Sequence, residues 1–250
     1  MIRRPPRSTR KESSAASDVY KRQELRCDCV LVLGGDGTNR LVAKNIGNVP
    51  IIPISTGTNN AFPIDIDPTI AGLAAGFYIK NKKDFKYLIK QFPYLKIIID
   101  KEKEDIALVD LAISNQNFVG SKAIWDPAVI DQLYLTQSNP VSIGLSSIGS
   151  KLTQIPKNNA LRIDFGTKGE KIYAPIGPGL ISDLIIKKWE LFSYNKKINL
   201  TGYLGTIALD GEREVEIYKK NKLQISLEKS GPWVLDVIES VKQENLYRTN

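Results

Sequence analysis

The sequence predicts an α/β N-terminal domain with a truncated, open parallel sheet, followed by a β-rich, sandwich-like domain and a C-terminal helix. Two observations lead to this fold class. Residues 24–93 repeat the order strand, polar loop, helix twice, which is typical of a mostly parallel sheet. Residues 94–233 hold many short strand-like runs with little helical spacing, and residues 234–250 are expected to form a helix and tail that return to the first domain.

Each element expected in the first domain has a local signal. Cys27–Leu33 is a short apolar run that ends in glycines, as a buried parallel strand would. Asn39–Ile46 has the spacing of a helix, and Val49–Ile54 has the composition of a second strand. Thr69–Ile79 is the second expected helix, because Pro68 suits a first helical turn.

The second domain is expected to begin with a hairpin. Tyr94–Asp100 and Ile106–Ser114 are strand-like and are joined by the charged segment KEKED. The other expected strands are Leu133–Gln137, Ala160–Phe165, Lys171–Pro175, Leu184–Phe192, Asn199–Asp210, Glu214–Tyr218 and Leu223–Glu228. A closing helix is expected over Val234–Asn245.

The composition excludes several classes of protein. A chain of 250 residues with 42% hydrophobic and 25% charged residues is typical of a globular protein with a real core. No apolar run is long enough to cross a bilayer, so we expect no membrane partner. The chain has no histidine, which excludes a Ser-His-Asp triad and histidine metal motifs. Cys27 and Cys29 are expected to be buried thiols of a reducing, cytoplasmic compartment.

Most of the positive charge lies in the first 23 residues. Seven basic and two acidic residues there contribute +5 to the net charge of +8, so the rest of the chain carries only +3. A weakly charged body does not predict binding to nucleic acid. Residues 1–23 are rich in Arg, Ser and Pro and predict a disordered tail. They also resemble translated sequencing-adapter DNA, so we exclude them from the fold as non-native.

The strongest motif is Gly34-Gly35-Asp36-Gly37-Thr38, which lies between the first expected strand and the first expected helix. Glycines let the backbone turn tightly and approach a ligand, and amides at a helix N-terminus can bind an anion. A carboxylate beside phosphate must accept a proton or hold a metal, so Asp36 is interpreted as a general base or a magnesium partner. An ordinary glycine turn with a capping Asp explains the spacing about equally well.

A second polar loop, Ser55-Thr56-Gly57-Thr58-Asn59-Asn60, follows the next expected strand. Loops at the carboxyl ends of neighbouring parallel strands open onto one crevice. Hydroxyl and amide groups there suit phosphate and ribose. A plain polar turn explains this loop taken alone, but less well once both loops share one sheet edge.

Family resemblance gives these loops a chemical interpretation. GGDGTNR at 34–40 and STGTNNAFP at 55–63 resemble the superfamily of NAD kinases and diacylglycerol kinases, and are closest to the acetoin catabolism protein X group of ATP-NAD kinase relatives. APIGPGL at 174–180 is similar to an NAD-kinase loop of the β-rich domain, and Asp210-Gly211-Glu212 is similar to a motif of the lipid kinases.

The resemblance implies a kinase that transfers phosphate from ATP to NAD, giving NADP. Asp36 would deprotonate the 2′-hydroxyl of the adenosine ribose, and Mg²⁺ would bridge the phosphates. The residues that the resemblance assigns to nucleotide binding are Gly34, Gly35, Gly37, Thr38, Asn39, Thr56, Gly57, Thr58, Asn59, Asn60 and Glu212. Small-molecule nucleotides are therefore the expected partners, and a homo-oligomer is expected at full length.

Departures from the family pattern leave alternatives open. The usual Gly-Ser-Thr-Ala-Tyr segment is missing, Ser142–Gly149 stands in its place, and Gly179 replaces a usual His. Two alternatives to NAD phosphorylation therefore stay open: a kinase whose acceptor is a lipid or another small alcohol, and a catalytically inactive nucleotide-binding regulator. Asp210-Gly211 is favoured slightly as a hairpin turn only. Relatives have one or two further α/β units before the first strand, so an incomplete cleft and a poorly folded or inactive chain are expected.

Overall fold

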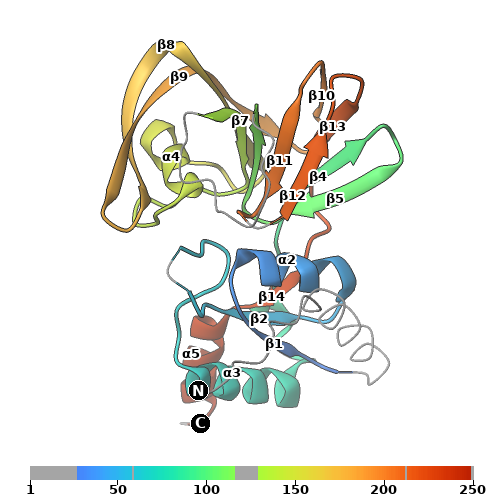
Figure 1. Ribbon diagram of the computed structural model, residues 1–250. Coiled ribbons are helices and arrows are strands. Elements are labelled where there is room, and N and C mark those ends of the chain that lie inside the picture. Colours follow the sequence, from blue (N-terminus) through green and yellow to red (C-terminus); the bar gives the residue numbers. More distant parts are fainter. Residues whose placement is uncertain (1–26, 58, 116–128, 212, 249–250) are drawn as a thin grey trace, which may run out of the picture.

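The computed structural model describes residues 27–57, 59–115, 129–211 and 213–248 (Figure 1). The predicted fold class is confirmed, because an α/β layer lies beside a β-rich domain and the chain ends in a helix. The tail predicted to be non-native lies outside the described residues.

The first sheet contains strands from both ends of the described chain. Its order is β1-β2-β14-β3, where β1 is Val30–Leu33, β2 is Ile51–Ile54, β14 is Trp233–Leu235 and β3 is Ile89–Gln91. β1 and β14 both run parallel to β2, whereas β3 is antiparallel to β14. All four residues of β2 are buried, as expected for the centre of a sheet that is covered on both faces.

Helices cover both faces of this sheet. Helix α2 (Asp36–Asn45) lies between the sheet and the β-rich domain, and α3 (Pro68–Asn81) and α5 (Val237–Arg248) lie on the opposite side (Figure 1). α3 begins where predicted, because Asp67 accepts a hydrogen bond from the Thr69 amide at 2.7 Å. A short 3₁₀ turn, η1 (Lys86–Leu88), precedes β3.

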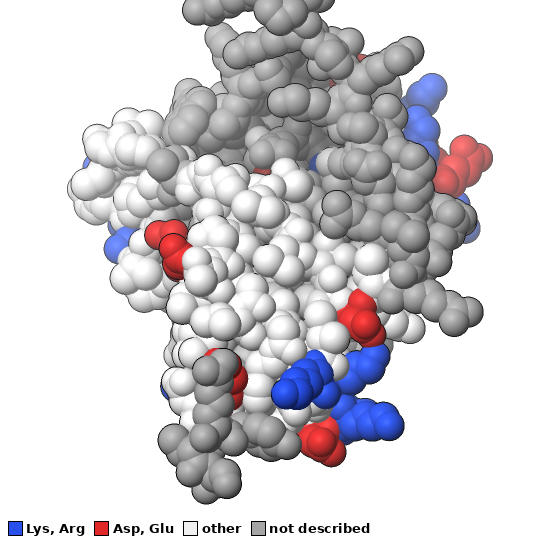
Figure 2. Space-filling view, turned by 90° about the horizontal axis from the view of Figure 1, so that it is seen from below, with Lys and Arg blue, Asp and Glu red and all other residues white. Residues whose placement is uncertain are grey.

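The outer face of α3 and α5 is poor in charge. Seen from below, its described part is largely free of charged side chains, which gather toward the edge of the face (Figure 2). Leu73 and Ile79 of α3 are 44% and 41% exposed. Gly72 and Gly76, on the same stretch of helix, are also exposed.

The β-rich domain is a sandwich of two sheets. One has the order β10-β13-β4-β5 and the other β12-β11-β6-β7-β8-β9. Its strands are β4 (Tyr94–Ile99), β5 (Lys103–Ala107), β6 (Asp110–Ser114), β7 (Ile130–Leu135), β8 (Asn159–Gly177), β9 (Leu180–Ser193), β10 (Lys197–Thr201), β11 (Gly205–Leu209), β12 (Arg213–Ile217) and β13 (Lys222–Glu228). Leu95 and Ile225 of one sheet share a core with Ile113 and Ile207 of the other.

Several predicted elements were wrong in extent. The strand predicted over 106–114 is two strands, because the Leu108 and Val109 amides donate to the Asp210 side chain and not to a strand. The strand predicted over 199–210 is also interrupted, near Gly202, whose φ is +83°. Helix α4 (Leu145–Leu152), which packs on β8, was not predicted as a helix.

Other predicted elements were merged or shifted in the structure. The strands predicted over 160–165 and 171–175 form the single long strand β8. The closing helix was predicted from Val234, but β14 ends at Leu235 and α5 starts at Val237. The first helix starts at Asp36, three residues before its predicted start, which places the motif carboxylate in its first turn.

Candidate functional site

The glycine loop brings Asp36 to the N-terminus of α2. The Gly34 amide donates to the Ile54 carbonyl at 3.0 Å, which ties the loop to the end of β2. A Cβ atom on Gly34 would lie 2.6 Å from the Thr38 Cβ, so only glycine fits there without movement. Gly35 precedes the helix in an extended conformation, and Asp36 is its first residue.

The Asp36 carboxylate faces the second polar loop. The Ala61 amide donates to its two oxygens at 3.1 and 3.0 Å, and the Phe62 amide donates to Oδ1 at 2.8 Å. Asp36 is 8% exposed. Two loops that follow the neighbouring parallel strands β1 and β2 are therefore joined through this carboxylate, as expected at the carboxyl edge of such a sheet.

The loop after β2 leaves some of its polar groups open. Thr56 and Gly57 are exposed, and the loop lines a hollow of about 420 Å³. Asn60 donates to the Ser55 hydroxyl at 2.9 Å and so shapes the turn. Asn59 Oδ1 is buried without a hydrogen-bond partner. Thr58 lies outside the described residues.

Asn39 differs from the other predicted binding residues. Its side chain is fully buried, and its Nδ2 donates to the Gly35 carbonyl at 2.9 Å. This contact supports the glycine loop from inside, and Asn39 Oδ1 is buried without a hydrogen-bond partner. Glu212, the remaining predicted residue, lies outside the described residues.

Asp210 belongs to this site, although the sequence pattern favoured a turn alone. It is at a hairpin turn, since Asp210 and Gly211 have φ angles of +51° and +67°. Its buried carboxylate accepts hydrogen bonds from the amides of Leu108, Val109 and Asp110 at 2.9, 2.8 and 3.2 Å. The turn and the site are therefore compatible roles for this residue.

Asp110 is the third buried carboxylate of the cluster. Burial, followed by the negative charges of Asp210 and Asp36, raises its pKa well above the usual range. Burial also raises the pKa of Asp210 to about 7, with a further upward contribution from Asp36, although three backbone amides oppose the shift. Asp110 Oδ1 has no hydrogen-bond partner. Asp110 and Asp210 therefore hold their protons more tightly than ordinary aspartates do.

Arg40 is the basic residue beside this cluster. It lies one helical turn after Asp36 and is 3% exposed. Its Nε is 3.7 Å from Asp210 Oδ2, and its Nη1 is 3.4 Å from Asp105 Oδ1. Among the described residues, no group of three or more His, Cys, Asp and Glu side chains is arranged to hold a metal ion.

Sequence reasoning found two loops of this site and missed three residues. Asp110 stands in an ordinary strand pattern, and nothing near it in the sequence indicates a site. Arg40 could have been found, because it follows Asp36 by one helical turn and so faces the same side of a helix. Asp210 could have been found because the Asp-Gly-Glu resemblance had already drawn attention to it.

The predicted loop at 174–180 lies beside α4. The Pro175 carbonyl accepts hydrogen bonds from the Gly144 amide and the Ser147 hydroxyl, both at 3.0 Å. Gly179 has a φ of +71° at the turn between β8 and β9. The two segments that depart from the NAD-kinase pattern, 142–149 and 174–180, are therefore neighbours in space.

Comparison with known proteins identifies the family. The family model of the acetoin catabolism protein X C-terminal domain matches residues 93–230, more than half of the chain. The chain belongs to the acetoin catabolism protein X family. The family model of the ATP-NAD kinase N-terminal domain matches residues 4–76. The first domain is thus similar to that of ATP-NAD kinases, and the second domain to that of acetoin catabolism protein X. The resemblance predicted from the two loops is confirmed.

A curated relative supports the same assignment. Acetoin catabolism protein X of Cupriavidus necator is 35% identical over 207 residues, which are 79% of this chain and 58% of that protein. The chain therefore spans somewhat more than half the length of this relative.

Solved structures of kinases are similar at lower identity. Yeast NADH kinase complexed with NADH has a TM-score of 0.49 and 15% identity, covering 87% of this chain and 65% of that one. An NAD kinase from Archaeoglobus fulgidus in complex with ATP has a TM-score of 0.42 and 16% identity, covering 94% and 93%. In the described part of the chain, no helix is both long and apolar enough to cross a membrane.

Proposed function

We propose that this acetoin catabolism protein X homologue is an ATP-dependent phosphotransferase whose acceptor is the 2′-hydroxyl of the adenosine ribose of NAD, giving NADP. The match of its first domain to ATP-NAD kinases supports the reaction class. The free cysteines Cys27 and Cys29 support a reducing, cytoplasmic setting.

One observation supports this proposal most directly. The Asp36 carboxylate is bound by the amides of Ala61 and Phe62, immediately after the loop that contains Thr56 and Asn60. A general base must lie within hydrogen-bond reach of the hydroxyl that it deprotonates. A ribose held by the Thr56–Asn60 loop would lie next to this carboxylate.

Asp36 keeps the capacity to accept a proton despite its backbone contacts. Its Oδ2 accepts from the Ala61 amide at 3.0 Å, and its Oδ1 accepts from the amides of Ala61 and Phe62. An ionised carboxylate offers about four lone-pair positions, and the substrate hydroxyl would donate to one of them. The two amides fix the direction in which the carboxylate points.

The N-terminus of α2 is the proposed site for the donor phosphates. The first amides of a helix have no partner within the helix, and the helix dipole favours an anion there. Gly37 and Thr38 lie in this first turn and are the proposed donors. The Gly34 amide is bound to Ile54, so Gly34 contributes by allowing close packing with Thr38. Mg²⁺ would arrive with ATP as part of the substrate.

The test is formation of NADP from NAD and magnesium-ATP, measured by an NADP-specific cycling assay. We expect the full-length protein to form NADP and its Asp36→Asn variant to lose about a hundredfold or more in rate, the usual contribution of a general base. Asp236→Asn is the matched control, because Asp236 pairs with Lys90 on the surface. Absence of NADP with the full-length protein would overturn the proposal.

A second function, a nucleotide-binding regulator without catalysis, is favoured by one observation. Asp36 is only 8% exposed, and both its oxygens already accept amide hydrogen bonds. A purely structural carboxylate would look the same. Equilibrium dialysis with labelled ATP and NAD separates the two functions, since binding without NADP formation supports the regulator and binding with turnover supports the kinase.

A further inference from the structure

Arg40 connects the two domains next to the proposed base. It lies on α2, whereas its partners Asp105 and Asp210 belong to β5 and to the turn after β11. Residues four apart on a helix share one side, so Arg40 and Asp36 both face the β-rich domain. The contacts of Arg40 therefore fix the rotation of the helix that carries Asp36.

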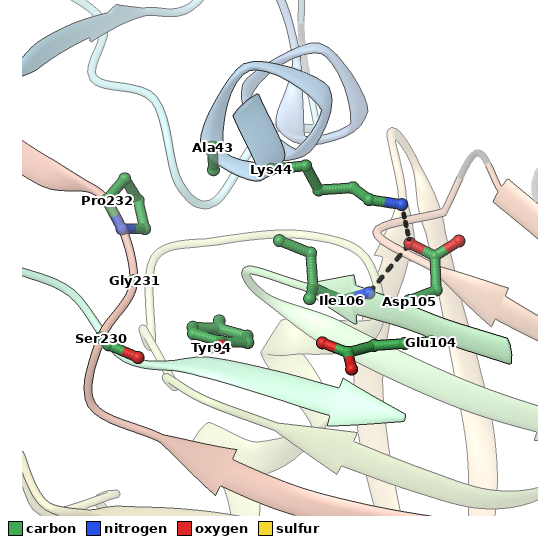
Figure 3. Close-up of a pocket in the computed structure, with 9 residues that line it drawn as sticks. All are labelled: Ala43, Lys44, Tyr94, Glu104, Asp105, Ile106, Ser230, Gly231 and Pro232. Carbon is green, nitrogen blue, oxygen red and sulfur yellow. Dashed lines mark hydrogen bonds and ion pairs between the residues drawn. The ribbon is translucent and has the colours of Figure 1, made fainter. Parts of the chain in front are cut away.

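Close packing is incomplete on one side of α2. Val42 and Leu108 belong to one apolar core, which joins the helix to the segment between β5 and β6. A hollow of about 380 Å³ nevertheless lies between the C-terminal half of α2 and the β-rich domain, and Lys44, Glu104 and Asp105 are among its lining residues (Figure 3). The same three residues also line a second hollow of about 280 Å³. Lys44 Nζ contacts Asp105 Oδ1 at 2.8 Å, so charge contacts add to the apolar packing of α2 here.

The charges around Arg40 are mostly negative. Asp105 on β5 and Asp210 after β11 contact it, Asp36 on α2 and Asp110 on β6 lie close enough to Asp210 for their charges to interact, and Lys44 on α2 is already paired with Asp105. Glu104 of β5 is paired with Lys96. Among the described residues, Arg40 is the cation that contacts the Asp210 carboxylate. Because this ion pair is buried, loss of Arg40 would leave a buried carboxylate without a counter-charge, which destabilises a protein more than loss of an exposed pair.

We propose that Arg40 is a positioning residue that orients Asp36 through Asp105 and Asp210 and supplies the counter-charge of the buried carboxylate cluster. The part of this inference that concerns orientation of the base rests on the proposed function. Arg40 does not act on the substrate. It sets where the base points and how readily the cluster ionises.

The test compares Arg40→Met, Arg40→Lys and the control Lys44→Met. Lys44→Met removes an ion pair to the same Asp105 but leaves the Asp210 contact in place. In the pH profile of NADP formation, we expect Arg40→Met to move the acidic limb upward by about one pH unit or more, because an opposite charge within ~4–6 Å favours the ionised carboxylate. Arg40→Lys should restore most of the wild-type profile, and Lys44→Met should leave the limb unchanged.

A second measurement decides the counter-charge without any turnover. The urea midpoint of Arg40→Met should fall further below wild type as pH rises, since the uncompensated carboxylates ionise at higher pH. A deficit that stays constant with pH, or one as large in Arg40→Lys as in Arg40→Met, would overturn the inference. If the full-length protein makes no NADP, the proposed function fails while the urea series still tests Arg40. Should Arg40→Met not fold, Arg40→Gln takes its place in both measurements, because glutamine keeps a polar side chain but removes the charge.

Discussion

Replacement of Asp210 by Asn should change stability in a direction that reverses with pH. In the wild type, the folded state raises the pKa of Asp210 from 3.8 to about 7, mainly through burial. A raised pKa means that the folded state binds this proton more tightly than the unfolded state. The resulting stability is fully present below the unfolded pKa and is lost as the pH rises through the folded value.

The magnitude follows from these two pKa values. One pH unit corresponds to about 1.4 kcal/mol, so wild-type stability should fall by about 4 kcal/mol between them because of this group. Asn cannot ionise and lacks this slope. Its amide also replaces Oδ2, which accepts from Leu108 at 2.9 Å, and leaves that buried amide unpaired. An unpaired buried donor costs about 1–3 kcal/mol.

Urea unfolding should therefore show a crossing. At about pH 4 the variant should be less stable than wild type by about 0.5–2.5 kcal/mol, and at about pH 9 it should be more stable by about 1–3 kcal/mol. Asp236→Asn is the control, because the pKa of Asp236 is lowered despite an opposing effect of burial, chiefly by Lys90. Its deficit should not vary over this range. A constant deficit for Asp210→Asn, or one that grows with pH, would refute the assignment of a raised pKa.

Three further predictions concern other parts of the site and core. Gly34→Ala should lower the unfolding free energy by about 1–3 kcal/mol through the clash with Thr38, whereas Gly72→Ala, which meets nothing within 4 Å, should be neutral or stabilising in the same urea assay. Thr136→Val should cost about 1 kcal/mol in thermal or urea unfolding, because the Thr136 hydroxyl donates to a buried carbonyl at 2.6 Å. Burial raises the pKa of Cys29 to about 11, so its alkylation, followed by peptide mass spectrometry, should accelerate about tenfold per pH unit below that value; a flat rate would contradict its burial.

Local patterns predicted the first domain better than the second. The run before Gly34 and the run before Ser55 became β1 and β2, because an apolar run followed by glycine or polar loop residues has few alternatives in a covered sheet. The β-rich domain was harder, since strand ends there depend on distant partners. The break between β5 and β6 exists because Asp210, far along the chain, takes the amides of Leu108 and Val109.

The same reasoning explains which site residues the sequence could indicate. Asp36 and Thr56 stand in loops whose glycines and hydroxyls are unusual in themselves. Asp110 is a single acidic residue within a strand. It belongs to the cluster only because the fold brings it close to the carboxylates of Asp210 and Asp36. Tertiary contacts between residues 100 positions apart, such as that of the Asp110 amide with Asp210, cannot be read from local spacing.

The ionisation of the cluster is therefore a property of the domain interface. Asp36 comes from the α/β domain, and Asp110 and Asp210 come from the β-rich domain. Asp36 raises the pKa of Asp110 and of Asp210 only when α2 lies against the β-rich domain, and Arg40 contacts both β5 and the turn after β11 in that arrangement. Separation of the domains would hydrate Asp110 and Asp210 and return their pKa values toward those of ordinary aspartates. A kinase built this way would keep the charged surroundings of its base only while its two domains remain in contact.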